Sequence, residues 1–224
     1  MNFVIKNNLN DEEEQYLQTR FLSAAAALGI SEKVALPLYD QVHYEYTDWS
    51  RHYHNLSHIL SLLGLSELFA AQLKEPALVD MAIWFHDVVY DSKKKDNELQ
   101  SALLMEQLLR PYLKKEQLDF VYALIMSTSG HKPLLPENAD NLWFLDFDLA
   151  ILASDKKTYR KYSDAIREEY KSLFSFFVYN AGRKKVLKSF LERKTLYFSY
   201  EFQEKYELIA RENLTWEIAG LKEG

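Results

Sequence analysis

Apolar residues recur at intervals of three and four along most of the chain, while strict alternation of apolar and polar residues is scarce. The first spacing puts apolar side chains on one face of an α-helix, whereas alternation is typical of a half-buried strand. The 224 residues include six glycines and five prolines, a small number of the residues that interrupt regular structure. The pattern therefore predicts an all-α protein.

The limits of the predicted helices follow from cap and breaker residues. Asn10 or Asp11 caps the first helix, which ends near Gly29, and Pro76 fits the first turn of a later helix. A loop is expected at 130–138, which contains glycine, asparagine and two prolines. The other expected helices are 31–46, about 54–74, 76–87, 96–109, 116–127 and 144–152, followed by two or three after 155.

Histidines and aspartates in apolar surroundings are the candidate functional residues. His54 and His58 are four residues apart, so on the helix expected at 54–74 both would lie on one face. His86 and Asp87 follow the apolar segment AIWF, and an aspartate there is costly to bury without a partner such as a cation. Imidazole with carboxylate is a ligand set that suits Zn, Mn, Fe or Co better than Ca.

Two further aspartates, Asp146 and Asp148, lie in the apolar run WFLDFDLAIL. They are about 200° apart on a helix, so they cannot face the same point, and periodicity does not choose between them. Each feature alone has an ordinary explanation, because a lone histidine in a helix is usually a core or surface residue and Asp148 could cap a helix. The paired histidines, the embedded His-Asp and a later buried aspartate together indicate a metal site.

The combined pattern resembles the H…HD…D signature of the HD superfamily, whose members are all-α metal-dependent phosphohydrolases. His58, His86-Asp87 and a later aspartate supply the signature, and RHYHNLSHI is similar to the YHNxxH motif of cyclic-nucleotide phosphodiesterases. The segment DLA that begins at Asp148 is similar to the D-L-S element that carries their last metal ligand, which favours Asp148 over Asp146. With WFHDVVYD and DNELQSA, the pattern also resembles a group of small bacterial predicted HD phosphohydrolases.

The resemblance implies both a fold and a chemistry. The fold would be an HD-domain helical bundle in one domain, 1–224, with the metal-site core at about 45–155 and a C-terminal helical extension at about 156–224. His58, His86, Asp87 and Asp148 would hold one or two divalent cations, drawn from Mn, Fe, Co, Zn and Mg. His54 would be the general acid that protonates the leaving oxygen after attack by a metal-activated water, and Asp87 would bridge to a second metal.

Three further residues are candidates for contacts with the substrate, a phosphate ester such as a nucleotide or cyclic nucleotide. Arg51 flanks the histidine cluster and is the candidate for binding phosphate. His131, in TSGH, is a candidate substrate-binding residue or a ligand of a second metal. Arg183 is a further available cation, and the preceding Gly182, inside a helical stretch, indicates a packing or close-approach constraint.

The sequence differs from the enzymes that it resembles at positions that bear on the substrate, so the resemblance does not identify the substrate. HDVVYD lacks the further histidine that phosphodiesterases have soon after HD, and Tyr90-Asp91 stands where alarmone hydrolases have Glu-Asp. The alternative function is a non-catalytic HD-fold module that binds a metal or nucleotide and signals to a partner. Retention of the candidate acid His54 together with the metal ligands favours the hydrolase.

Composition narrows the partners and the location. Hydrophobic residues make up 48% of the chain, aromatic residues 14% and charged residues 27%, which is typical of a globular protein with large core side chains. A net charge of −6 argues against sequence-independent nucleic-acid binding, and the absence of cysteine excludes thiolate ligands and nucleophiles.

The polar start and the lack of a long apolar run predict a cytoplasmic protein with no membrane contact. The aromatic-rich part from Tyr159 to Trp216 is either helical core or the interface of a homodimer.

Overall fold

The computed structural model describes residues 3–221, and every regular element within that range is helical. The all-α expectation is therefore confirmed. The elements are α1 (Asp11–Ala27), α2 (Glu32–Glu45), α3 (Leu56–Leu68), η1 (Ala70–Gln72), α4 (Pro76–Phe85), α5 (Asn97–Leu109), α6 (Lys115–Thr128), α7 (Ala139–Leu149), η2 (Ala150–Ala153), α8 (Lys156–Tyr170), α9 (Phe176–Leu191) and α10 (Tyr200–Gly220).

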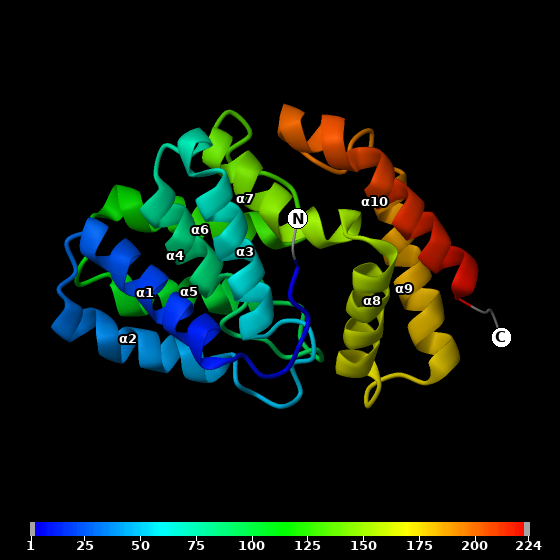
Figure 1. Cartoon of the computed structure of the whole chain (residues 1–224), viewed down its shortest axis with the longest axis horizontal. Coiled ribbons are helices and arrows are strands. Elements are labelled where there is room, and N and C mark those ends of the chain that lie inside the picture. Colours follow the sequence, from blue (N-terminus) through cyan, green and yellow to red (C-terminus); the bar gives the residue numbers. More distant parts are fainter. Residues whose placement is uncertain (1–2, 222–224) are drawn as a thin grey trace.

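Helix α4 lies at the centre of the N-terminal helices and packs against α1, α3 and α6 (Figure 1). Its residues from Leu78 to Phe85 are all buried, because the segment is apolar almost all round except at Asp80. Asp80 is held by Arg20, at 2.6 Å, and by the hydroxyl of Ser66. The rigid, buried α4 ends at His86, so it fixes the position of the His-Asp pair.

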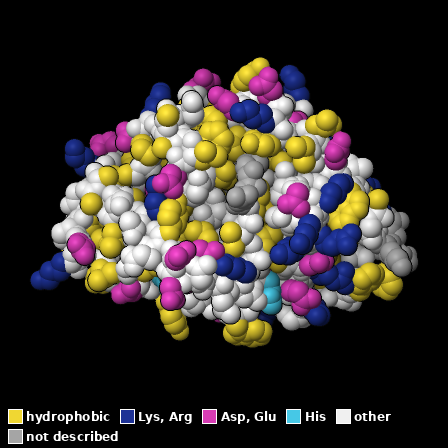
Figure 2. Space-filling model, viewed as in Figure 1, with side chains coloured by type: hydrophobic (Ala, Val, Ile, Leu, Met, Phe, Trp, Pro, Cys, Tyr) yellow, Lys and Arg dark blue, Asp and Glu magenta, His cyan; other side chains and the backbone are white. Residues whose placement is uncertain are grey.

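Helices α8, α9 and α10 form a second group beside the first, as the yellow to red ribbons of Figure 1 show. Helix α10 packs against η2, α8 and α9, and the buried apolar residues of both groups belong to one continuous core. Helix α9 carries four basic and no acidic residues, and Lys and Arg side chains gather over the C-terminal helices in Figure 2. No helix in residues 3–221 is long and apolar enough to cross a membrane.

Local capping explains why one predicted helix limit holds and another is wrong. Asn10 accepts a hydrogen bond from the backbone N–H of Glu13, and Glu13 bonds back to Asn10, which confirms the predicted start of α1. Helix α3, however, begins at Leu56 rather than near His54. The side chain of Asn55 accepts a hydrogen bond from the N–H of Ser57 and caps the helix there, so His54 lies in the turn that precedes it.

Candidate metal centre

Three side chains from three helices meet in a buried group at the junction of α3, α4 and α7. His58 lies in the first turn of α3, His86 follows the last residue of α4, and Asp148 lies in the last turn of α7. One ligand atom from each residue lies within 4.8 Å of the others. This His-His-Asp group could hold a metal ion.

The distances between the ligand atoms are those of groups that share a cation. Nε2 of His58 lies 3.1 Å from Nε2 of His86 and 3.4 Å from Oδ1 of Asp148. Ligand atoms that each lie about 2.0–2.2 Å from one cation are themselves about 3 to 3.6 Å apart, according to whether the coordination is octahedral or tetrahedral. Nδ1–H of His86 donates to the carbonyl oxygen of Ile83 at 2.8 Å, which leaves Nε2 as the ligand nitrogen. Two imidazoles and a carboxylate fit a divalent transition metal better than Ca.

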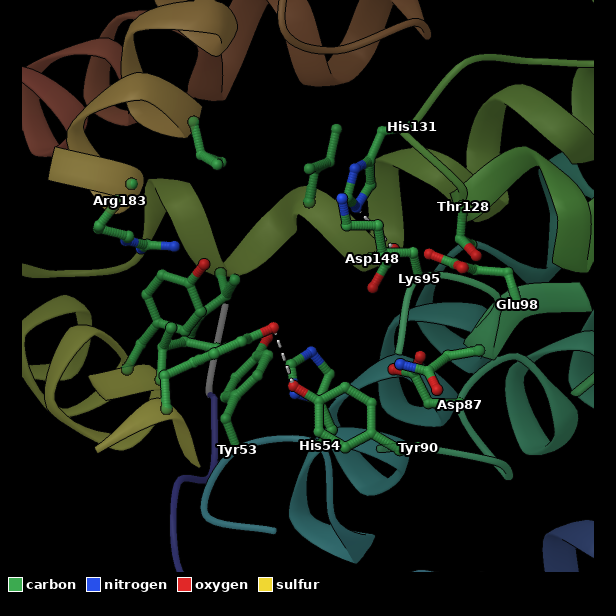
Figure 3. Close-up of a pocket in the computed structure, with 18 of the residues that line it drawn as sticks. Tyr53, His54, Asp87, Tyr90, Lys95, Glu98, Thr128, His131, Asp148 and Arg183 are labelled. Atoms are coloured by element: carbon green, nitrogen blue, oxygen red, sulfur yellow. Dashed lines mark hydrogen bonds and ion pairs between the residues drawn. The ribbon is translucent and has the colours of Figure 1, made fainter. Parts of the chain in front are cut away.

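Asp87 and His131 lie next to this group. Oδ2 of Asp87 lies 3.0 Å from Nε2 of His86 and 3.9 Å from Nε2 of His58. Nε2 of His131 lies 3.2 Å from Oδ2 of Asp148, and a dashed line joins these two residues in Figure 3. His131 has a φ of 50°, an uncommon conformation for a side chain with a Cβ, and Arg193 donates to the carbonyl oxygens of both Gly130 and His131.

The structure places Asp148, and not Asp146, against the histidines. Both oxygens of Asp146 accept backbone N–H groups, from Phe198 and Ser199 at 2.7 Å each. Asp146 therefore fixes the segment before α10 on the opposite side of α7. Its burial raises its pKa to about 7, despite these hydrogen bonds.

The close imidazoles and carboxylates change one another's pKa. Burial alone would lower the pKa of His86, but the carboxylate of Asp87 raises it to about 9. Burial lowers the pKa of His58, whose two neighbouring carboxylates do not fully compensate. Burial would raise the pKa of Asp148, but hydrogen bonds from His131 and His58 hold it well below its usual range. Since cations bind deprotonated ligands, metal affinity at this group depends on pH.

His54 lies beside the group and is held by a residue of the C-terminal helices. Its Nδ1–H donates to Oε2 of Glu169, in the last turn of α8, at 2.7 Å. The other oxygen of Glu169 accepts the backbone N–H groups of Tyr53 and His54. The ring of Tyr90 stacks on that of His54, with centroids 4.3 Å apart, and its hydroxyl donates to Glu169. Burial alone would lower the pKa of His54, but Glu169 raises it above its ordinary value.

A pocket of about 570 Å³ opens over the metal group. His54, His86, Asp87 and Asp148 line one end, while η2, α8 and α9 supply the opposite wall. In Figure 3, Asp87, Glu98 and Thr128 lie on one side of the cavity and Arg183 on the other. The metal group is therefore open to a ligand that also touches the C-terminal helices.

The predicted phosphate contact from Arg51 does not agree with its position. Arg51 is 5% exposed, and its guanidinium donates to the carbonyl oxygens of Asp87, Val88 and His54 at 2.6, 2.8 and 3.2 Å. It does not line the pocket. Arg51 instead joins the segment after α4 to the turn before α3, because a guanidinium in an interior must satisfy its donors with acceptors.

Sequence reasoning did not identify Glu169, although one signal was present. The buried face of α8 repeats at Tyr159, Tyr162 and Ile166, and Glu169 is the next position of that face. A carboxylate on an apolar stripe needs a partner. The expectation that Gly182 marks a packing or close-approach constraint is also wrong, because a Cβ built there meets no atom within 4 Å.

Searches with the chain found no matching family model, no matching curated protein and no matching solved structure.

Proposed function

We propose that this protein is a metal-dependent phosphohydrolase that cleaves a phosphate ester. The observation that carries the proposal is that His86 and Asp148 of the metal-binding group and His54 of the His54–Glu169 pair line the same pocket. Such an arrangement supplies a cation site and a proton donor to one bound ligand. The resemblance of the H…HD…D and YHNxxH patterns to HD phosphohydrolases supports the same reaction.

The metal would be held by His58, His86 and Asp148, with Asp87 adjacent to them. When bound, a divalent cation lowers the pKa of a water and neutralises charge on phosphoryl oxygens. The chain's own contribution is to orient the ligands. The hydrogen bond from His86 to the Ile83 carbonyl and the contact of His131 with Asp148 hold two of them in place.

His54 would protonate the oxygen of the leaving alcohol. Glu169 accepts the hydrogen bond from Nδ1, which leaves Nε2 as the nitrogen that can donate to a ligand. The raised pKa of His54 keeps the ring protonated to a higher pH than that of an isolated histidine. The stacked ring of Tyr90 prevents rotation of the imidazole away from this orientation. Glu169 and Tyr90 are thus positioning residues for His54.

The test is a screen of phosphomonoesters and phosphodiesters, including nucleotides and cyclic nucleotides, with Mn, Fe, Co, Mg or Zn. We expect hydrolysis with at least one metal, a metal content of one or two per chain by elemental analysis, and a loss of kcat of about 100-fold or more in His54→Ala. His52→Ala is the matched control, since His52 is not among the residues that line the pocket. Metal binding without hydrolysis of any ester would favour the alternative of a non-catalytic binding module.

A further inference from the structure

The wall of the pocket opposite the metal group is apolar and aromatic. On α8, Tyr162, Ile166 and Tyr170 face the pocket at four-residue intervals. Two exposed residues, Phe174 and Val178, carry the apolar surface to the pocket's mouth. A phosphoryl group needs none of this surface, because its oxygens bind cations and hydrogen-bond donors.

Gly182 keeps this part of the pocket open. On α9, Val178, Gly182, Val186 and Phe190 line the pocket at successive four-residue steps, so they lie on one face of the helix. A Cβ added at Gly182 would meet nothing within 4 Å. Glycine inside a helix lowers helix stability, and here no close backbone contact accounts for it. The absence of a side chain at Gly182 therefore leaves space in the pocket.

The charges that line the pocket suit a single phosphoryl group. Among the described lining residues the lysines and arginines are Lys94, Lys95 and Arg183, and His54, when protonated, adds one charge beside the cation site. Arg183 is already paired with Glu217, at 2.7 and 3.1 Å. The metal end carries the carboxylates of Asp87, Glu98 and Asp148, as Figure 3 shows. A chain of several phosphates would find too little positive charge beyond the cation site.

We propose that the substrate is an ester with one phosphoryl group and a bulky apolar, preferably aromatic, alcohol part, which lies between α8 and α9 in the space left by Gly182. This inference rests on the proposed function for the position of the phosphoryl group. A pocket of about 570 Å³ is within the range that encloses ligands of several rings. Tyrosine and phenylalanine faces stack on planar groups and contact aliphatic ones.

The test compares ethyl phosphate with 2-(1-naphthyl)ethyl phosphate, each as the monoester and as the methyl diester. Their leaving alcohols are both alkanols, so size rather than leaving-group basicity differs. We expect kcat/KM at least tenfold higher for the naphthyl ester. In Gly182→Leu the ratio of the two kcat/KM values should fall at least tenfold. Gly64→Leu is the matched control, because Gly64 is also inside a helix, also has open space at its Cβ and does not line the pocket.

A binding measurement separates this inference from the proposed reaction. Calorimetric titration of 2-(1-naphthyl)ethanol into the metal-free protein should show binding to the wild type and to Gly64→Leu, and at least tenfold weaker binding to Gly182→Leu. Binding without hydrolysis of any ester would support the apolar compartment and contradict the phosphohydrolase. Equal kcat/KM for both esters, with no binding of the alcohol, would overturn the compartment alone. If Gly182→Leu does not fold, Val186→Trp on the same helix face takes its place.

Discussion

Nδ1 of His54 and Oε2 of Glu169 lie 2.7 Å apart, although 115 residues separate them in the chain. The pair joins the turn before α3 to the end of α8, and so connects the helices of the candidate metal group to the C-terminal helices. Burial alone would raise the pKa of Glu169, but His54 and the backbone N–H groups of Tyr53 and His54 lower it. The opposite shifts of the two pKa values favour an ion pair in which the candidate acid His54 is the cation.

Replacement of Glu169 by Gln should lower kcat/KM by about tenfold or more and shift its basic limb to lower pH. The acid form of His54 exists below its pKa, and that pKa is raised by the charge of Glu169. Without that charge the ring loses its proton at a lower pH, so activity declines earlier as pH rises. Glu168→Gln is the control, because Glu168 pairs with Lys171 on the exposed surface. An unchanged pH profile in Glu169→Gln would contradict the role of His54 as the acid.

Exchange of Asp148 and of Asp146 for Asn should have different effects. Asp148→Asn should reduce the metal content of the purified protein. The carboxylate lies 3.4 Å from Nε2 of His58, close enough to share a cation with it, and also contacts His131. Asp146→Asn should retain the metal and lose about 1–3 kcal/mol of unfolding free energy, because an amide N–H₂ then faces the N–H groups of Phe198 or Ser199. Elemental analysis and chemical denaturation measure the two effects. Normal metal content in Asp148→Asn would show that the ligand assignment is wrong.

Removal of the metal should lower the thermal stability, since a cation that binds only the folded chain stabilises it. At a free concentration of about 100 times Kd this stabilisation is about 2.7 kcal/mol. Scanning calorimetry with a chelator, and with each metal added back, measures the shift in Tm. In His86→Ala, which lacks one of the three ligands, added metal should no longer raise Tm.

Arg51→Lys should lower the free energy of unfolding by about 2–3 kcal/mol, and its main effect should not be on KM. The guanidinium donates to three carbonyl oxygens, and the single ammonium of lysine cannot reproduce that geometry. Arg110→Lys is the control, since Arg110 forms an exposed pair with Glu106. A raised KM with unchanged unfolding free energy would restore Arg51 to the role of phosphate ligand.

The Arg183–Glu217 pair should give stability a defined pH dependence. Burial alone would raise the pKa of Glu217, but hydrogen bonds from Arg183 lower it below its ordinary value. A lowered carboxyl pKa stabilises the folded chain above the unfolded pKa, about 4.3, and this contribution is lost as pH falls through the folded value. Glu217→Gln should therefore cost about 2–4 kcal/mol at pH 7 and progressively less below about pH 4. Denaturant titrations at pH 7 and below about pH 4 measure this loss of stability. Glu106→Gln is the control, because Glu106 forms an exposed pair with Arg110.

Apolar periodicity and caps were sufficient to predict the all-α class and most helix limits, because these depend on residues within a few positions of one another. The cap at Asn10 and Pro76 in the first turn of α4 are examples. The sequence also singled out His58, His86 and Asp87 by their spacing and apolar surroundings, and the resemblance to the HD superfamily favoured Asp148. It could not choose between Asp146 and Asp148 by periodicity, because both positions of α7 are surrounded by apolar residues.

Only the tertiary structure decided what surrounds the candidate metal group. The contact of Glu169 with His54 and the hydrogen bond of Arg51 to the Asp87 carbonyl join segments that are distant in sequence, and the open space at Gly182 depends on which elements pack around α9. Such contacts depend on how helices pack, and the same local pattern is compatible with several packings. The sequence by itself determined which side chains needed partners, and the packing of α8 and α9 against the helices of the candidate metal group determined which partners they have.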